Sequence, residues 1–160
     1  MADLVQNADG SVSARNELDG LDLGRWGGPK TPSVAVPRWG GEKTVKVPLA
    51  AVDTAAGILS WANPESVPVI VTGVLVDVTT QSSGACTISI GTSATGTTSS
   101  ANLIDTLSVA AAGSFDNITD KGTNGKSRQR LAVGSYVTGS TASGASAGLV
   151  GNAYITYIVT

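Results

Sequence analysis

The sequence contains no histidine and one cysteine, Cys86. A disulfide within the chain, a zinc site of cysteine and histidine, and a catalytic triad based on histidine are therefore excluded. A serine nucleophile would need a lysine or a carboxylate as its base, and the Gly134-Ser135 and Gly144-Ala145-Ser146 turns form no nucleophile elbow. We therefore expect no enzyme: no catalytic residue, no cofactor and no metal site.

Charge is also scarce. Charged residues make up 14% of the chain and the net charge is −2, whereas soluble domains average about 25% charged residues. No overall basic field is available to attract nucleic acid, so we expect no nucleic-acid partner. Residues 1–20 lack the pattern of a secretory signal, and the most apolar run, residues 67–78, is shorter than the roughly 20 residues of a membrane helix. We expect no membrane association.

Large aromatic side chains are few: three Trp, three Tyr and one Phe. A core must therefore be packed from Val, Ile, Leu and Ala, and we expect Cys86 to be one of its small buried members. The 20 glycines, with abundant Ser, Thr and Val, favour short strands joined by tight turns. Turn signals recur at spacings of roughly 8–12 residues beyond residue 48. This pattern predicts an all-β fold, an antiparallel β-sandwich or jelly roll with an extended N-terminal arm.

The strongest predicted strand is Val69–Thr79, with Val74, Val76 and Val78 on one face. A Gly-containing turn at 81–84 separates it from residues 85–91, so these two strands predict a β-hairpin. A second hairpin is predicted to close around residues 139–148. Further strands are predicted at 44–47, 56–61, 130–138 and 149–160, and residues 100–107 read as a short helical turn or a strand.

Residues 1–48 differ in character from the rest of the chain. They hold four of the six prolines, and their apolar residues follow neither the strand period nor the helix period. We assign 1–48 to an extended N-terminal arm without a core of its own, and 49–160 to the β-sandwich domain.

The arm contains a repeated unit: RWGGPKT at 25–31 returns as RWGGEKT at 38–44. Gly-Gly lets a backbone approach another surface closely, and Trp and Arg are enriched at the energetic centres of interfaces. One hypothesis is that both units dock on neighbouring subunits, since 48 extended residues could reach up to about 150 Å. The alternative is that both Trp side chains fold back onto their own domain. The predicted partner-binding residues are Arg25, Trp26, Gly27, Gly28, Arg38, Trp39, Gly40 and Gly41.

Two polar groups lie in the loops that follow residue 110. A cluster of four cations reads as a solvated loop, with an acidic partner or a phosphate as the alternative; its members are Lys121, Lys126, Arg128 and Arg130. A group of oxygen-bearing side chains suggests calcium, but its spacing does not match an EF-hand and turn chemistry accounts for it. Its members are Asp116, Asn117, Asp120 and Asn124.

Three segments carry a resemblance to a known class of proteins: ANPESVPVIVTGVLVDVTTQSSGACTISIG at 62–91, SSANLIDTL at 99–107 and LAVGSYVTGSTASGASAGLVGNAYITYI at 131–158. In their overall residue pattern and in the placement of their turns, these segments resemble bacteriophage capsid decoration (cement) proteins and head-fibre-like β-sandwich virion proteins. The resemblance implies a symmetric oligomer, with a trimer favoured, and no catalytic residues. It does not extend to the arm.

We therefore expect a structural protein of a phage virion that decorates and cements the capsid surface, its arm clasping neighbouring subunits. The expected partners are the major capsid protein and neighbouring copies of the chain itself. One alternative is a tail or head-fibre component. Another is a carbohydrate-binding β-sandwich module, although the sequence offers few aromatics to stack on sugars.

Overall fold

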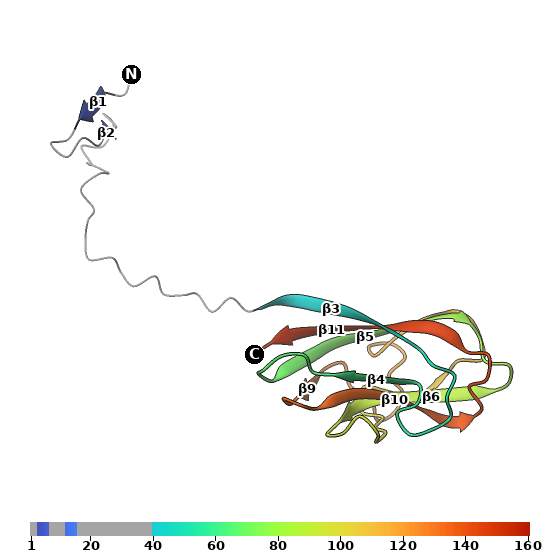
Figure 1. Ribbon diagram of the computed structural model, residues 1–160. Helices are drawn as coiled ribbons and strands as arrows, with labels where there is room; N and C mark the ends of the chain where they lie inside the picture. Colours follow the sequence, from blue (N-terminus) through green and yellow to red (C-terminus); the bar gives the residue numbers. More distant parts are fainter. Residues whose placement is uncertain (1–2, 7–11, 16–39) are drawn as a thin grey trace. The chain divides into compact units, whose positions relative to one another are not determined.

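The computed structural model describes residues 3–6, 12–15 and 40–160 (Figure 1). The chain divides into two units, residues 1–38 and 39–160. In the first, β1 (Asp3–Gln6) pairs antiparallel with β2 (Val12–Arg15), with Asp3 opposite Arg15. The sequence analysis did not predict this strand pair.

The second unit is built from strands alone, and the described residues contain no helix. One sheet has the order β3-β11-β5-β8, and β9 also pairs with β5; the other has the order β4-β10-β6-β7. All of these pairings are antiparallel. The strands are β3 (Gly40–Pro48), β4 (Leu59–Ala62), β5 (Val69–Thr80), β6 (Cys86–Ser93), β7 (Ile104–Ser108), β8 (Gly113–Asp116), β9 (Gln129–Leu131), β10 (Tyr136–Gly144) and β11 (Val150–Val159).

The strands pair as if one long hairpin had been rolled up. The first strand of the unit, β3, pairs with the last, β11; β4 pairs with β10, β5 with β8, and β6 with β7. Rolling such a ribbon places its successive strand pairs alternately in one and the other of two facing sheets, which is the jelly-roll arrangement. The predicted all-β class, an antiparallel sandwich or jelly roll, is confirmed.

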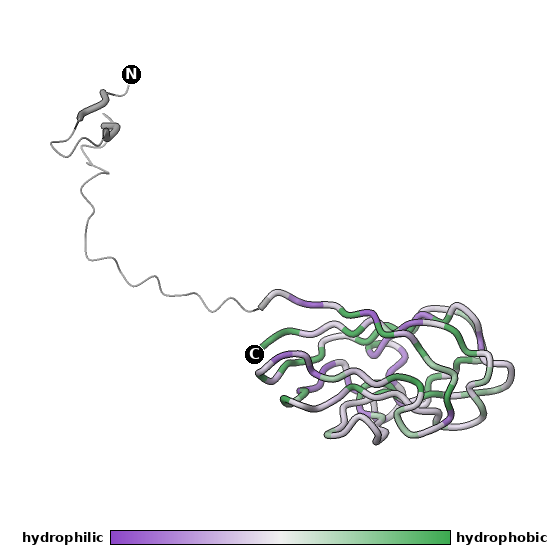
Figure 2. Tube along the Cα trace, in the orientation of Figure 1, coloured by the Kyte–Doolittle hydropathy of each residue, from purple (hydrophilic) through white to green (hydrophobic). Residues whose placement is uncertain are grey.

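The core lies between the two sheets and is mainly aliphatic, as predicted. On β5, Val74, Val76 and Val78 are buried whereas Leu75 on the opposite face is 41% exposed. On β6, Cys86, Ile88 and Ile90 are buried in the same core, which confirms the expected burial of Cys86. Ser89, which lies between the two isoleucines, is buried as well. Figure 2 shows apolar and polar residues alternating along the strands of the sandwich.

Both predicted hairpins are wrong. β5 and β6 follow each other in the chain but belong to different sheets, and so do β10 and β11. The Gly- and Ser-rich connections at 81–84 and 145–149 therefore cross from one sheet to the other. A tight turn has the same local residue preferences in either setting, so the sequence around it does not choose between them.

Two further segments differ from expectation, and at a third the structure decides between two alternatives. Gly40–Pro48, assigned to the arm, forms edge strand β3, so the edge strand predicted at 44–47 exists and is longer. The strand predicted at 130–138 is two strands, β9 and β10, separated by a turn in which Gly134 has φ of 71°. Of the two interpretations of residues 100–107, the strand is correct, as β7.

Candidate functional site

The repeated units lie mostly outside the described residues. Arg25, Trp26, Gly27, Gly28, Arg38 and Trp39 belong to that part of the chain. Gly40 and Gly41 are the first residues of β3, and Gly40 is opposite Val159 near the end of β11. The second RWGG unit therefore leads directly into an edge of the first sheet.

This edge, the root of the arm, is joined to the sandwich by side chains as well as by the backbone. Glu42 Oε1 accepts a hydrogen bond from Thr72 Oγ1 at 2.7 Å, and the hydroxyls of Thr44 and Thr156 lie 3.0 Å apart. Backbone pairing with β11 runs from Gly40 to Pro48 with one irregularity. Residues 40–48 are thus a fixed part of the domain.

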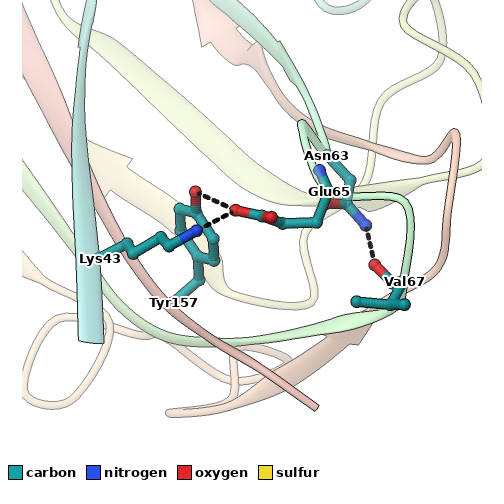
Figure 3. A network of polar contacts seen from close by, with 5 residues as sticks. All are labelled: Lys43, Asn63, Glu65, Val67 and Tyr157. Atoms are coloured by element: carbon teal, nitrogen blue, oxygen red, sulfur yellow. Dashed lines mark hydrogen bonds and ion pairs between the residues drawn. The ribbon is translucent and has the colours of Figure 1, made fainter. Parts of the chain in front are cut away.

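The shortest of these side-chain contacts belongs to a three-residue network that we call the root anchor: Lys43, Glu65 and Tyr157 (Figure 3). Lys43 Nζ lies 2.6 Å from Glu65 Oε1, and the Tyr157 hydroxyl donates to the same oxygen at 3.1 Å. Lys43 is half exposed, whereas Tyr157 is 5% exposed. One carboxylate therefore holds the edge strand and a buried tyrosine of the neighbouring strand.

A tight turn positions Glu65. Asn63, which is buried, accepts a hydrogen bond from the Glu65 N–H through Oδ1 at 3.0 Å. Its Nδ2 donates to the carbonyls of Val67 and Ala132, each at 3.1 Å. An Asn that bonds its own backbone two residues on is a standard turn device, and here it fixes the carboxylate toward β3.

The electrostatics of the root anchor follow from this geometry. The hydrogen bond and charge of Lys43 lower the pKa of Glu65 below its ordinary value of 4.5, and the same contact raises the pKa of Lys43 above 10.5. Burial, followed by the bond to Glu65, raises the pKa of Tyr157 above 10.0. At neutral pH the anchor is therefore a carboxylate between an ammonium group and a neutral phenol.

Trp61, the tryptophan outside the repeats, packs beside the root anchor. Its ring centroid lies 5.2 Å from that of Tyr157 with the planes tilted by 46°. Trp61 is partly buried against the core. It belongs to β4, so its contact with Tyr157 of β11 joins the two sheets.

The oxygen-bearing group near residue 116 behaves as turn chemistry predicts. Asp116 Oδ1 accepts hydrogen bonds from the backbone N–H groups of Ile118 and Thr119, both at 2.7 Å. These donors lower the pKa of Asp116 below 3.8. Asn117 is fully buried, and its Oδ1 accepts from Val74 N at 2.8 Å. These side chains fix loops against β5.

An open hollow of about 310 Å³ lies between residues 99–101 and the strands β6 and β10. Seven small residues line it, five of them Ser or Thr and none aromatic. Three of these hydroxyls already serve the fold: Ser140 Oγ accepts from Ala56 N at 2.7 Å, Ser89 Oγ accepts from Thr106 N at 3.1 Å, and Thr141 Oγ1 donates to Asp53 Oδ1 at 2.8 Å. The hollow offers hydroxyl groups, one of which is bonded to the carboxylate of Asp53.

Residues 144–148 read Gly-Ala-Ser-Ala-Gly, which is the Gly-x-Ser-x-Gly spacing of a nucleophile elbow, so the sequence alone did not exclude an elbow here. They connect strand β10 to strand β11, whereas an elbow turns from a strand into a helix. Ser146 is fully buried, and its N–H donates to Asp53 Oδ1 at 2.8 Å. The backbone hydrogen bond of Ser146 thus helps to hold the connection between the two sheets in place.

The sequence analysis did not single out Lys43, Glu65 or Tyr157. The two partners of Glu65, Lys43 and Tyr157, lie 22 and 92 positions away from it in the chain. Only the rolled topology brings them together.

The chain matches no protein-family model, no curated protein and no solved structure. Among the residues that the structure describes, no helix is long and apolar enough to cross a membrane.

Proposed function

We propose that this chain is a non-enzymatic structural protein of a phage virion, which decorates and cements the capsid surface. The arm would bind neighbouring subunits through Trp26 and Trp39, and the jelly roll would stand on the shell. The partners would be the major capsid protein and other copies of this chain, in a homo-oligomer for which a trimer is favoured. The chain would use no cofactor, no nucleic acid and no membrane.

The observation that carries this proposal is the way in which the second RWGG unit enters the sheet. A tether that holds two subunits together has to pass its load to a rigid body. Here Gly40 and Gly41 open an edge strand that is paired along its length with β11 and held from the side by the root anchor. A pull on the arm is therefore shared among many backbone hydrogen bonds.

Cementing follows by linkage. A protein that binds only the assembled shell stabilises it by RT ln(1 + [L]/Kd), which is about 2.7 kcal/mol for each site at a hundredfold excess over Kd. Binding distributed over several subunits adds such contributions. The fold is compatible with this role, because jelly rolls occur in viral capsid proteins, but it is also used by lectins.

A carbohydrate-binding module is the second candidate, and the hydroxyl-lined hollow favours it. Sugar sites commonly use an aromatic face for stacking, which the lining of this hollow does not provide. A tail or head-fibre component would use the same domain at another position in the virion.

The test first requires that a major capsid protein be encoded next to this chain, and it then uses shells assembled from that protein. We expect the Trp26→Ala/Trp39→Ala double variant to occupy these shells at least tenfold less than the wild type while keeping its unfolding temperature. The matched control is Val34→Ala/Val36→Ala, which changes apolar positions of the same arm outside the repeats. Unchanged occupancy of the double Trp variant would overturn the proposal.

A further inference from the structure

Four of the six cations of residues 40–160 lie within ten positions of one another. They are Lys121, Lys126, Arg128 and Arg130, and residues 121–130, which we call the cation loop, contain no acidic residue. All four side chains are exposed. In a domain with so little charge, this concentration is a distinct surface feature.

The backbone of the cation loop is held in place from three directions. Asp105 N donates to the Lys121 carbonyl at 2.9 Å, and Lys126 N donates to the Asn102 carbonyl at 3.1 Å. The buried Asn117 donates through Nδ2 to the carbonyls of Lys126 and Ser127, each at 3.1 Å. Gly125 is buried so tightly that a Cβ there would lie 2.0 Å from the Lys121 carbonyl oxygen. A partner would meet cations on a prepared frame, which reduces the entropy lost on binding.

Nearby carboxylates do not neutralise these cations by direct contact. Within residues 40–160 the ion pair found is Lys43–Glu65, so no loop cation has a carboxylate oxygen within 4 Å. Asp105 Oδ2 accepts from Asn124 Nδ2 at 2.7 Å, and Asp120 Oδ2 accepts from Asp116 N at 3.0 Å. Asp116 accepts hydrogen bonds from the backbone of its own turn. The carboxylates of all three neighbouring aspartates therefore accept hydrogen bonds from N–H groups.

An apolar side chain adjoins the cation loop. Ile118 is 62% exposed and directly follows Asn117, whose side chain is bonded to the loop backbone. The surface therefore suits a partner that carries several carboxylates together with aliphatic side chains.

The chain itself contains a segment of this composition. Residues 1–22 have five acidic residues and one basic residue, and they include Leu4, Val5, Leu18 and Leu21. Residues 23–39 separate this segment from β3, and 17 extended residues span up to about 60 Å. That length is sufficient to reach a neighbouring domain.

We propose that the cation loop binds the acidic N-terminal segment, residues 1–22, of a second copy of this chain. This inference rests on the proposed function and deepens it: the tryptophan units hold the shell, and the acidic segment joins one copy to the next. Electrostatic attraction would give the contact its specificity and its dependence on salt.

The experiment is a charge swap in the full-length chain, with the average mass measured by sedimentation. The loop variant is Lys121→Glu/Lys126→Glu/Arg128→Glu/Arg130→Glu, and the segment variant is Asp3→Lys/Asp9→Lys/Glu17→Lys/Asp19→Lys/Asp22→Lys. We expect the wild type to associate at about 20 mM salt and at least tenfold more weakly at about 500 mM. Each variant alone should lose this association, and a 1:1 mixture should regain it because the reversed loop meets the reversed segment.

Control variants make each result decisive. Lys30→Glu/Lys46→Glu alters charge outside both surfaces and should associate like the wild type. If the reversed loop unfolds, Lys121→Gln/Lys126→Gln/Arg128→Gln/Arg130→Gln replaces it and should still lose association. A mixture no heavier than its components, or a wild type with the same mass at both salt concentrations, overturns the inference.

The two proposals can fail separately. Trp26→Ala/Trp39→Ala should lose the shell and keep the salt-dependent association. If the charge swap restores association but the wild type binds no shell, the capsid function is wrong and the contact between copies stands.

Discussion

Lys43 Nζ and Glu65 Oε1, 2.6 Å apart, join the edge strand of one sheet to the loop that follows the edge strand of the other. β3 and β4 are each the first strand of their sheet in spatial order. The ion pair therefore closes one open side of the sandwich, at the place where the arm begins.

Removing the Glu65 side chain should destabilise the fold more than removing the Lys43 side chain. Glu65→Ala takes away the acceptor of both Lys43 and the buried Tyr157 hydroxyl, whereas Lys43→Ala leaves the tyrosine bond intact. We expect Glu65→Ala to lower the unfolding temperature more than Lys43→Ala does. The double variant should lower it by less than the sum of the two single changes. Thermal unfolding of the four chains measures this, and strictly additive effects would contradict the network.

The root anchor also predicts a dependence on pH. The pKa of Glu65 is held below 4.5 and that of Asp116 below 3.8 in the folded chain. A carboxyl group with a lowered folded pKa contributes stability above its unfolded pKa and loses that contribution as pH falls through the folded value. Stability should therefore fall between about pH 5 and pH 2, and fall less in Glu65→Gln. Denaturation at a series of pH values tests this; parallel curves for both chains would count against it.

Two leucines provide a matched test of the sandwich. Leu131 on β9 is completely buried, whereas Leu75 on β5 is 41% exposed. Leu131→Ala should cost about 2–5 kcal/mol of unfolding free energy because it leaves a cavity. Leu75→Ala should change it by less than about 0.5 kcal/mol. Urea denaturation gives both values, and equal losses would mean that the two faces of the sheet are assigned wrongly.

Two glycines separate backbone strain from steric clash. Gly134 and Gly144 have nearly the same φ, 71° and 73°. A Cβ on Gly134 would meet nothing within 4 Å, whereas one on Gly144 would lie 1.9 Å from the Ala85 carbonyl oxygen. Gly134→Ala should cost roughly 1–2 kcal/mol for the left-handed backbone alone, and Gly144→Ala clearly more. If Gly144→Ala were the milder change in chemical denaturation, the pairing of β10 with β6 at this point would be wrong.

A buried hydroxyl without a partner should be replaceable with a gain in stability. Thr138 is fully buried on β10, and its Oγ1 has no hydrogen-bond partner among the described residues. Thr138→Val keeps the shape and removes the unpaired group, so we expect a gain of up to about 1 kcal/mol. Thr141→Val is the control on the same strand: its Oγ1 donates to Asp53 Oδ1 at 2.8 Å, and stability should fall. If calorimetry showed a loss of stability in both variants, the Thr138 hydroxyl would have to have a hydrogen-bond partner.

Local pattern in the sequence was sufficient for the class of fold and for the inner face of the longest strand, β5. The alternation of Val74, Val76 and Val78 with exposed Leu75 and half-buried Asp77 marks the core side of β5 because side chains alternate along any strand. The shortage of aromatics likewise predicted an aliphatic core. These properties depend on composition and on a period of two residues, which are both visible in a sequence.

The tertiary structure alone decided which strands pair and which polar residues meet. β3 finds β11 more than 100 positions away, and Glu65 meets Lys43 and Tyr157 only because of that pairing. Pairing over such separations is fixed by the simultaneous burial of two sheets, to which every core residue contributes, and no short segment encodes it. For the same reason the turn at 81–84 could be recognised from its residues, while the sheet to which it leads could not.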